Sequence, residues 1–495
     1  MLRRTAAVLT AVLVAGLLVV SEGGRTENAQ VGAAAPAGQA PYGLPRTTDR
    51  DRPPDVVLVL TDDQRPDTVR WMPSVTRQIR DRGTRFTRVV ASTPTCCPSR
   101  ASIVTGRYAR DTGVYGNTAP NGGWRTFLAN GNEQHTLATA LQAQGYRTGL
   151  VGKYFNGFAQ NDNGAAAGHR PPGWDLFLTF ATETGGYLDY SLTDGSVQGS
   201  HVEDYSTDVL GARAARFVRR TPADQPLFLM FTPFAPHKPY RPARRHRGTL
   251  DLPSYRPDSV TRSVRDKPAF LRDRPRVPQR AIDAIRTRQQ EMLLAVDEAV
   301  AGVLRSLRRS GRLDNTLVVY MSDNGLLIGD HHTIGKDMPY RFATDVPLLL
   351  RWDGRVAAGA VDKRLVSTVD VTETILRATG ATMATSGVDL MAPPARDHVA
   401  LEGRRWHRLD GSVPHPGFCG VRTERWLFVR WGDGFEELYD HEFDRSETVN
   451  RVADPTQLPV LDAMRETARA SCVPEPPGFS WDVDGTAPDA PVSKQ

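Results

Sequence analysis

Lysine is scarce in this chain of 495 residues, although basic residues as a whole are not. Six of the 62 basic residues are lysine, namely Lys153, Lys238, Lys267, Lys336, Lys363 and Lys494. Arginine is always protonated, whereas lysine offers a compact ammonium whose pKa shifts readily on burial. We therefore expect some of these lysines to stand where such a group is needed, although chance retention is the simpler explanation for any single one.

The sequence also lacks the signatures of nucleic-acid binding and of membrane-spanning helices. There is no Cys/His finger, RNP-like aromatic motif or heptad-bearing basic helix, so we expect no nucleic-acid partner. The net charge of +6 is only mildly basic and suits an acidic substrate. The longest apolar run, residues 6–20, is shorter than the roughly 20 residues that span a bilayer.

Residues 1–30 are predicted to be a signal peptide. Arg3 and Arg4 precede the apolar run, and small and polar residues follow it. No cysteine stands just after the run, where a lipoprotein anchor would need one. We therefore expect a secreted or extracytoplasmic protein without a stable membrane anchor. The paired arginines leave the export route, general or twin-arginine, open. Residues 31–53 are predicted to be a flexible linker.

Apolar runs alternate with helical patterns between residues 54 and 385. Runs at 55–61, 148–152, 226–233, 316–322 and 346–352 are typical of buried parallel strands, and 281–310 has one apolar helical face. This alternation predicts an α/β catalytic domain with a large, mostly parallel sheet sandwiched by helices. Residues 386–475 are predicted to form a smaller α+β subdomain with a short antiparallel sheet, and residues 476–495 a disordered tail.

Polar side chains follow four of the predicted strands directly or closely. Asp62 and Asp63 follow the first, Lys153 the second, His237 the third, and Asp323 with Asn324 the fourth. A turn or a helix cap explains any one of them, but the coincidence at four strands favours a ligand site at the carboxyl edge of the sheet. The oxygen donors in this set suit Ca²⁺, or Mg²⁺, rather than zinc.

Residues 96–106 read CCPSRASIVTG and lie between TDDQ at 61–64 and GKY at 152–154. This segment resembles the signature of the sulfatase family, C-x-P-S-R followed by T-G, in which the first cysteine is oxidised to formylglycine. Cys96 holds the modified position and Cys97 the variable one. The resemblance covers about residues 54–450 and includes ELYD at 437–440. The local sequence is most similar to N-acetylglucosamine-6-sulfatase-like glycan sulfatases.

The resemblance implies a sulfuric ester hydrolase that acts on sulfated sugars and is matured by a formylglycine-generating enzyme. The hydrated formylglycine would attack sulfur while bound to the metal. The implied metal ligands are Asp62, Asp63, Cys96, Asp323 and Asn324. The other implied roles are the orientation of the hydrate by Arg100, sulfate binding by Lys153 and Lys336, and protonation of the leaving alcohol by His237 or Lys336.

One position departs from the family pattern. Many members carry a histidine two residues after the first active-site lysine, where this chain has Phe155. The base of the elimination step is therefore unassigned. His331 and His332 are candidates, and a solvent-facing position is the alternative for both.

Several alternatives stay open at this point. The same scaffold could hydrolyse phosphoesters or phosphonate monoesters, or bind sulfated glycans without turnover. The arginine- and proline-rich residues 239–280 are either a solvated loop or a rim that attracts a polyanion. Cys419 and Cys472 are either a disulfide, which export favours, or two free thiols. Lys238 and Lys267 are expected to lie on the surface.

Overall fold

The computed structural model describes residues 52–158, 168–181, 186–194, 197–393, 396–406 and 414–483. The expected signal peptide lies outside the described residues, as do residues 31–51 of the expected linker and residues 484–495 of the expected tail. All described residues belong to one compact unit. Within these ranges no helix is both long and apolar enough to cross a bilayer.

Ten strands of the described residues form one sheet in the order β12-β2-β11-β8-β1-β7-β3-β4-β5-β6. Their bounds are β1 Asp55–Thr61, β2 Thr84–Val90, β3 Arg147–Gly152, β4 Leu176–Phe180, β5 Tyr190–Thr193, β6 Val197–His201, β7 Leu227–Thr232, β8 Thr316–Ser322, β11 Leu348–Arg351 and β12 Ala360–Ser367. The central run from β8 to β4 is parallel, whereas β11 is antiparallel to both of its neighbours. The predicted large, mostly parallel sheet is confirmed.

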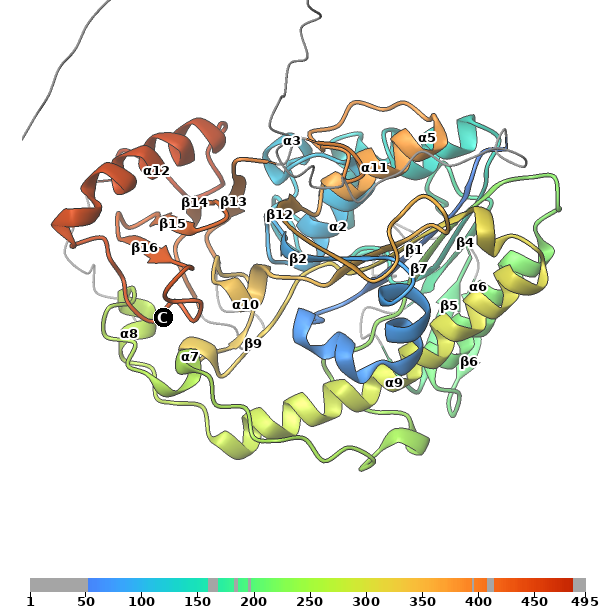
Figure 1. The fold of residues 1–495 in the computed structure, drawn as a ribbon, viewed down its shortest axis with the longest axis horizontal. Helices are drawn as coiled ribbons and strands as arrows, with labels where there is room; N and C mark the ends of the chain where they lie inside the picture. Colours follow the sequence, from blue (N-terminus) through green and yellow to red (C-terminus); the bar gives the residue numbers. More distant parts are fainter. Residues whose placement is uncertain are drawn as a thin grey trace, which may run out of the picture. The chain divides into compact units, whose positions relative to one another are not determined.

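Helices cover both faces of this sheet. On one face lie α2 (Cys96–Thr105), α5 (Leu137–Ala143) and α11 (Asp370–Thr379), and on the other lie α6 (Ser206–Arg220) and the long α9 (Gln279–Arg309), which run side by side (Figure 1). The shorter helices are α1 Pro73–Val75, α3 Ala109–Thr112, α4 Gly123–Ala129, α7 Asp258–Thr261, α8 Ala269–Arg272 and α10 Arg341–Thr344.

The sequence of strand β1 is an apolar run without alternation because both faces of the strand are buried. Val56, Leu58 and Leu60 pack into the core beneath α2, α5 and α11, whereas Val57 and Val59 pack into the core beneath α6 and α9. A strand buried on both faces has no polar side, so period-two alternation is lost. Each such side chain contributes about 1.5–3 kcal/mol by its burial.

A second, antiparallel sheet follows the large one in the chain. It consists of β13 Val399–Gly403, β14 Phe418–Arg422, β15 Trp426–Trp431 and β16 Glu436–Asp440, in that order. Helix α12 (Leu458–Ser471) packs on β14 and β15. The expected subdomain with a short antiparallel sheet is confirmed, with β13 as a strand that the sequence pattern did not predict. A two-stranded sheet of β9 Leu327–Ile328 and β10 Ile334–Gly335 stands apart.

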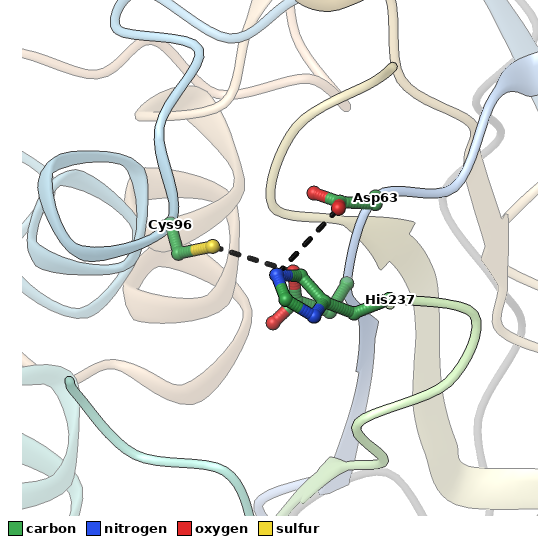
Figure 2. A group of neighbouring side chains, drawn as sticks. Asp63, Cys96 and His237 are labelled. Carbon is green, nitrogen blue, oxygen red and sulfur yellow. Dashed lines mark hydrogen bonds and ion pairs between the residues drawn. The ribbon is translucent and has the colours of Figure 1, made fainter. Parts of the chain in front are cut away.

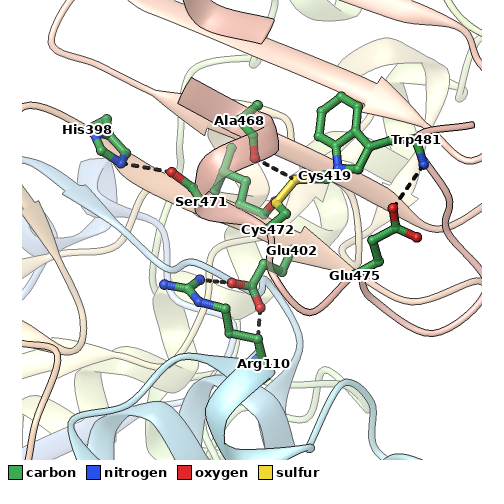
Figure 3. The surroundings of a disulfide bond; sticks show 10 residues. Arg110, His398, Glu402, Cys419, Ala468, Ser471, Cys472, Glu475 and Trp481 are labelled. Carbon is green, nitrogen blue, oxygen red and sulfur yellow. Dashed lines mark hydrogen bonds and ion pairs between the residues drawn. A yellow bond between two sulfur atoms is a disulfide. The ribbon is translucent and has the colours of Figure 1, made fainter. Parts of the chain in front are cut away.

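A disulfide joins this small sheet to the end of α12. Cys419 of β14 is bonded to Cys472, with the two Cα atoms 6.3 Å apart, so the predicted pairing is confirmed (Figure 3). Phe479 and Trp481 are buried in the same cluster. Packed structure therefore continues beyond residue 476, where the sequence predicted that a disordered tail begins, to at least Trp481.

Lys267 is not a surface residue, and that prediction was wrong. Its side chain is fully buried, with Nζ 3.2 Å from Asp266 Oδ1 and 4.6 Å from the centre of the Tyr439 ring. Glu437 is also fully buried, and burial raises the pKa of its carboxyl, although the charge of Lys267 acts in the opposite direction and favours the carboxylate. A buried carboxylate needs such a partner. Lys238 is exposed, as predicted.

Candidate active site

The carboxyl ends of four adjacent strands, β8, β1, β7 and β3, bring the polar residues singled out above to one place. The parallel register sets Thr61 of β1 opposite Ser322 of β8, and Gly152 of β3 opposite Thr232 of β7. Directly after Thr61, Gly152 and Ser322 come the predicted site residues Asp62 with Asp63, Lys153, and Asp323 with Asn324. His237 follows Thr232 after a short loop. Asn324 and Asp63, 261 positions apart in the chain, thus bond to each other at this edge.

Gly152 allows two strands to approach closely just before Lys153. Its φ is +126°, and a Cβ atom at this position would lie 2.0 Å from the carbonyl oxygen of Thr232. An L side chain would therefore clash and would also need a strained backbone. The next residue, Lys153, donates its backbone N–H to the same carbonyl at 2.8 Å, and its side chain reaches Asp62.

Cys96 is the first residue of α2, a helix that is buried along its whole length. Thr95 precedes it with extended backbone, and Gly106 ends the helix with a φ of +66°. The N–H of Cys97 donates to Oδ1 of Asn117 at 2.9 Å, and the Ser99 hydroxyl donates to the carbonyl of Asp323. The positive end of the helix dipole is thus directed at the group on residue 96, which suits an anionic ligand there.

The Cys96 sulfur sits among charged groups. Its thiol donates to Asp62 Oδ1 at 3.3 Å and accepts from Lys336 Nζ at 2.7 Å. Figure 2 shows Cys96, Asp63 and His237 turned toward one another from separate segments of the chain, with His237 Nε2 3.7 Å from Asp63 Oδ2. Burial, reinforced by the negative charge of Asp62, raises the pKa of the Cys96 thiol well above its usual value. The unmodified sulfur is therefore a neutral thiol rather than a nucleophilic thiolate.

Three cations and three carboxylates balance one another at this edge. Arg100 donates from Nε to Asp323 at 2.8 Å, from Nη2 to Asp62 at 3.3 Å, and from Nη1 to the carbonyl of Lys153 at 2.8 Å. Lys153 and Lys336 complete the set through ion pairs with Asp62 and Asp63. Burial acts to raise the pKa of Asp62, but these charges, Lys153 foremost, hold it well below its usual value. Burial, together with Asp62, raises the pKa of Asp323 to about 6.

The oxygen donors face a single cationic point. Lys336 Nζ contacts Asp63 Oδ1 and lies 3.4 Å from Asn324 Oδ1 and 3.7 Å from Asp62 Oδ1. Carboxylate and amide oxygens around one positive group are the donors that a hard divalent cation takes. Donor atoms of Asp62, Asp63, Cys96 and His237 all lie within 4.8 Å of one another. The residues present therefore fit a bound metal ion. His237 belongs to this group, whereas the predicted ligand Asp323 lies outside it and accepts from Arg100 and from the N–H groups of Asp63 and Asn324.

Residues 54–381 match the protein family described as Sulfatase. The chain belongs to the sulfatase family. Its Cys96 signature, the carboxylate cluster and the two lysines thus lie within the part that the family covers.

Curated relatives include two proteins described as sulfatases. The Extracellular sulfatase SULF-1 homolog of Drosophila melanogaster is 32% identical over 356 residues, which cover 66% of this chain and 30% of that protein. The N-acetylglucosamine-6-sulfatase of Homo sapiens is 30% identical over 356 residues, which cover 69% of this chain and 64% of that protein. The chain thus spans less than two thirds of the length of either relative.

Solved structures share the fold at low identity. One, described as a complex with its substrate D-glucosamine-2-N,6-O-disulfate, has a TM-score of 0.74 at 20% identity and covers 85% of this chain and 97% of that one. A phosphonate monoester hydrolase from Silicibacter pomeroyi has a TM-score of 0.65 at 23% identity and covers 84% of this chain and 95% of that one. Both likenesses show the fold alone.

Phe155, at the position where many sulfatases carry a histidine, points into the core. Its ring stacks on Phe127 with centroids 4.6 Å apart and meets Tyr154 edge-on at 4.5 Å. The side chain of the neighbouring Asn156 turns toward the start of α2 instead, since its Oδ1 accepts from the Cys97 thiol at 3.5 Å and its backbone N–H donates to the same sulfur at 3.2 Å. Asn156 stands in the GKYFNGF segment and could have been found from it, whereas nothing in the sequence marks Asn117.

His331 and His332 are buried and engaged elsewhere, so neither the catalytic nor the solvent-facing hypothesis describes them. His331 lies 3.8 Å from the carboxylate of Glu447, and His332 lies within hydrogen-bond distance of the carbonyls of Arg262 and Arg274. In the basic segment 239–280, Arg245 is held by carboxylates, since it bonds to Asp208 and Glu298. Its charge is therefore compensated within the protein.

Proposed function

We propose that the protein is a sulfuric ester hydrolase that acts on sulfated sugars and carries formylglycine at position 96. The observation that carries this proposal is the setting of Cys96. It opens a buried helix at the signature position, 3.3 Å from Asp62 and 2.7 Å from Lys336 Nζ. Hydrated formylglycine would supply a hydroxyl nucleophile, and a divalent ion held by Asp62, Asp63, Asp323 and Asn324 would keep that hydroxyl partly ionised.

The chain's own residues would bind and orient the ester. Lys153 and Lys336, together with the N-terminus of α2, would bind the sulfate oxygens and stabilise charge that grows on them. Arg100 would hold Asp62 and Asp323 in place through the bonds described above. His237 Nδ1 lies 2.5 Å from the carbonyl of Lys238 and must donate to it, so a neutral ring presents the lone pair of Nε2 to the site. Lys336, or His237 once its Nε2 has taken up a proton, would deliver the proton to the leaving alcohol.

The metal and the maturation route belong to the same proposal. The oxygen-rich donor set supports Ca²⁺, with Mg²⁺ as the alternative. Elemental analysis of the purified protein should find about one equivalent of Ca²⁺. A formylglycine-generating enzyme would oxidise Cys96 during maturation, and the relatives described as extracellular support a secreted protein.

Mass spectrometry of the peptide around Cys96, paired with kinetics, tests the proposal. We expect formylglycine at position 96, and a kcat/KM for 4-nitrophenyl sulfate well above that for 4-nitrophenyl phosphate. Cys96→Ala, prepared in parallel, is the matched control and should be inactive. An unmodified Cys96 in secreted protein, with no turnover of either ester, would instead favour a protein that binds sulfated glycans without cleaving them.

A phosphonate or phosphate ester hydrolase is the second candidate, because the likeness to the Silicibacter pomeroyi enzyme extends over 84% of this chain. The same nucleophile and metal would serve phosphoryl transfer. A higher kcat/KM for the aryl phosphate, or for a phosphonate monoester, than for the aryl sulfate would select this candidate.

A further inference from the structure

A hollow of about 510 Å³ lies beside the active-site helix. Its walls are residues 117–121, Asn156, residues 404–406 and residues 477–478. This volume is in the range of sites that hold small ligands. The walls come from the loop after α3, the segment after β13 and the chain that follows the disulfide.

The hollow begins one residue away from the nucleophile position. Asn117 Oδ1 accepts the N–H of Cys97 at 2.9 Å, and the Asn156 N–H donates to the Cys97 sulfur at 3.2 Å. Both asparagines line the hollow. The alcohol part of an ester whose sulfate sits at residue 96 would therefore have this hollow within reach.

Among the described residues that line the hollow, the charged ones are positive and none is a carboxylate. Arg404 and Arg405 are its ionisable residues, and the bonded partners of Arg404 are neutral: Nη1 donates to the carbonyls of Thr118 at 3.2 Å and Pro120 at 2.7 Å. Arg404 Nε is buried with no hydrogen-bond partner among the described residues. The charge of this half-buried guanidinium is offset through space by Asp337 rather than by a bonded carboxylate, unlike that of Arg110 or Arg245.

An aromatic face completes the hollow. The Arg404 guanidinium lies 5.3 Å from the centre of the Trp406 ring. An amphipathic ligand such as a sugar presents apolar C–H groups that pack on an indole, and hydroxyl groups that bond to amides such as Asn117 and Asn121.

The wall that carries these residues is fixed in place. Glu402 of β13 pairs with Arg110 of α3 (Figure 3). The backbone N–H of Glu402 donates to the carbonyl of Ser92 at 3.0 Å. Arg405 N–H donates to the carbonyl of Pro477 at 3.1 Å, and Trp406 N–H to that of His415 at 2.9 Å. A site built on a preorganised wall loses less entropy when it binds its ligand.

We propose that this hollow binds the sugar that carries the scissile sulfate and selects sugars with a second anionic group, which pairs with Arg404 and Arg405. This inference rests on the proposed function, because that function places the scissile ester at residue 96. The second anion is a carboxylate or a further sulfate, since both offer oxygens to a guanidinium fork.

Calorimetric binding to the full-length Cys96→Ala protein in calcium-containing buffer tests the proposal without turnover. The probes are glucosamine-6-sulfate, glucosamine-2-N,6-O-disulfate, and a disaccharide that joins 6-sulfated glucosamine to a uronic acid. We expect at least one of the doubly anionic probes to bind tenfold or more tightly than the monosulfate. The probe that gains identifies the anion as sulfate or carboxylate.

Arginine variants assign the preference to the hollow. Arg405→Gln and Arg404→Gln should reduce it to less than threefold, whereas Arg309→Gln, an exposed arginine at the end of α9, should keep it. Trp406→Ala should weaken all three probes alike. Equal affinity for all probes in the parent, or a preference retained in both arginine variants, overturns the proposal.

The two proposals fail separately. Formylglycine-bearing protein that does not turn over 4-nitrophenyl sulfate would sink the sulfatase function, since this small ester carries no second anion and does not need the hollow. Normal turnover of that ester with no preference among the sugars would sink only the present inference.

Discussion

Replacing Lys336 by alanine should reduce kcat/KM for a sulfate ester by about 10²–10³-fold, or about 2.7–4 kcal/mol of transition-state stabilisation. Lys336 Nζ bonds to Asp63, lies 2.7 Å from the Cys96 sulfur and lies 3.4 Å from Asn324 Oδ1. Its ammonium therefore stands beside the nucleophile position, where negative charge is transferred. We place its loss near the upper end of this range.

Lys153 should show a smaller loss from the same cause. Its Nζ bonds to Asp62, which accepts from the Cys96 thiol, whereas Lys336 Nζ bonds to the sulfur itself. We expect Lys153→Ala to lie near the lower end, about 10²-fold. Lys238→Ala is the matched control because that side chain is exposed on the loop beside His237, and it should stay within about twofold.

Initial rates with 4-nitrophenyl sulfate should be measured together with the formylglycine content and the bound metal. These measurements separate the loss of the ammonium from a loss of formylglycine or of metal. Removing an ammonium leaves the cluster more negative, so metal binding should be kept or tightened in Lys336→Ala. If the rate falls strongly while metal and formylglycine contents stay complete, the loss is due to the missing ammonium of Lys336. Equal rates for Lys336→Ala, Lys153→Ala and Lys238→Ala would refute the placement of both lysines at the reacting centre.

Three further predictions follow from other parts of the structure. Cys96→Ala should abolish turnover with an unchanged circular dichroism spectrum, and Cys97→Ala should cost less than about tenfold; equal losses would contradict the assignment. Opening the Cys419–Cys472 bridge by a double serine variant should cost about 4 kcal/mol in urea unfolding, because the bridge closes a loop of 53 residues; an unchanged midpoint would oppose this. Burial acts to raise the pKa of Glu447, but the imidazoles of His331 and His441 hold it well below its usual 4.5. A depressed carboxylate pKa stabilises the fold above pH 4.5 and loses that contribution as pH falls, so Glu447→Gln should cost about 1.5–3 kcal/mol at pH 7 and flatten the acid limb of a stability–pH curve.

The sequence predicted best the parts whose local pattern has one physical explanation. The run at Asp55–Thr61 agrees with β1 to the residue because both of its faces are buried and its polar neighbours mark its end. The pattern at residues 281–310 likewise predicted α9, which spans Gln279–Arg309. By contrast, β2 reads TRFTRVV and β12 reads AVDKRLVS. Because of their charged residues, these two strands were not predicted from the sequence. They pair near the edge of the sheet, where one side meets solvent.

The candidate site was predictable where a residue follows a strand or stands in a motif. Asp62, Lys153 and Asp323 each come directly after a strand, so their chain position fixes their place on the sheet edge. Asn117 and Trp406 have no such marker. They reach the hollow through loops whose path is set by long-range contacts such as Arg110 with Glu402, and a linear pattern does not contain those contacts.

Lysine scarcity pointed to buried ammonium groups, but it did not distinguish catalysis from stability. Lys153 and Lys336 pair with the buried carboxylates Asp62 and Asp63. Lys267 pairs with Asp266 and acts through its charge on a buried carboxylate, Glu437. Lys267 differs from the two active-site lysines because Glu437 belongs to the small sheet and not to the active site. The Glu437 carboxylate also accepts hydrogen bonds from Tyr340, Trp431 and Tyr439.

Lys267→Ala should therefore lower stability and leave the chemistry intact. Removing this ammonium leaves the buried Glu437 without an opposite charge, and loss of such a partner costs about 3–5 kcal/mol. We expect the urea midpoint to fall accordingly, while kcat/KM per folded molecule at low temperature stays within about twofold of the parent. The double variant Lys267→Met with Glu437→Gln should recover part of the lost stability, because it removes both charges. A rate loss like that of Lys336→Ala, without a loss of stability, would show that burial of this third ammonium serves the reaction after all.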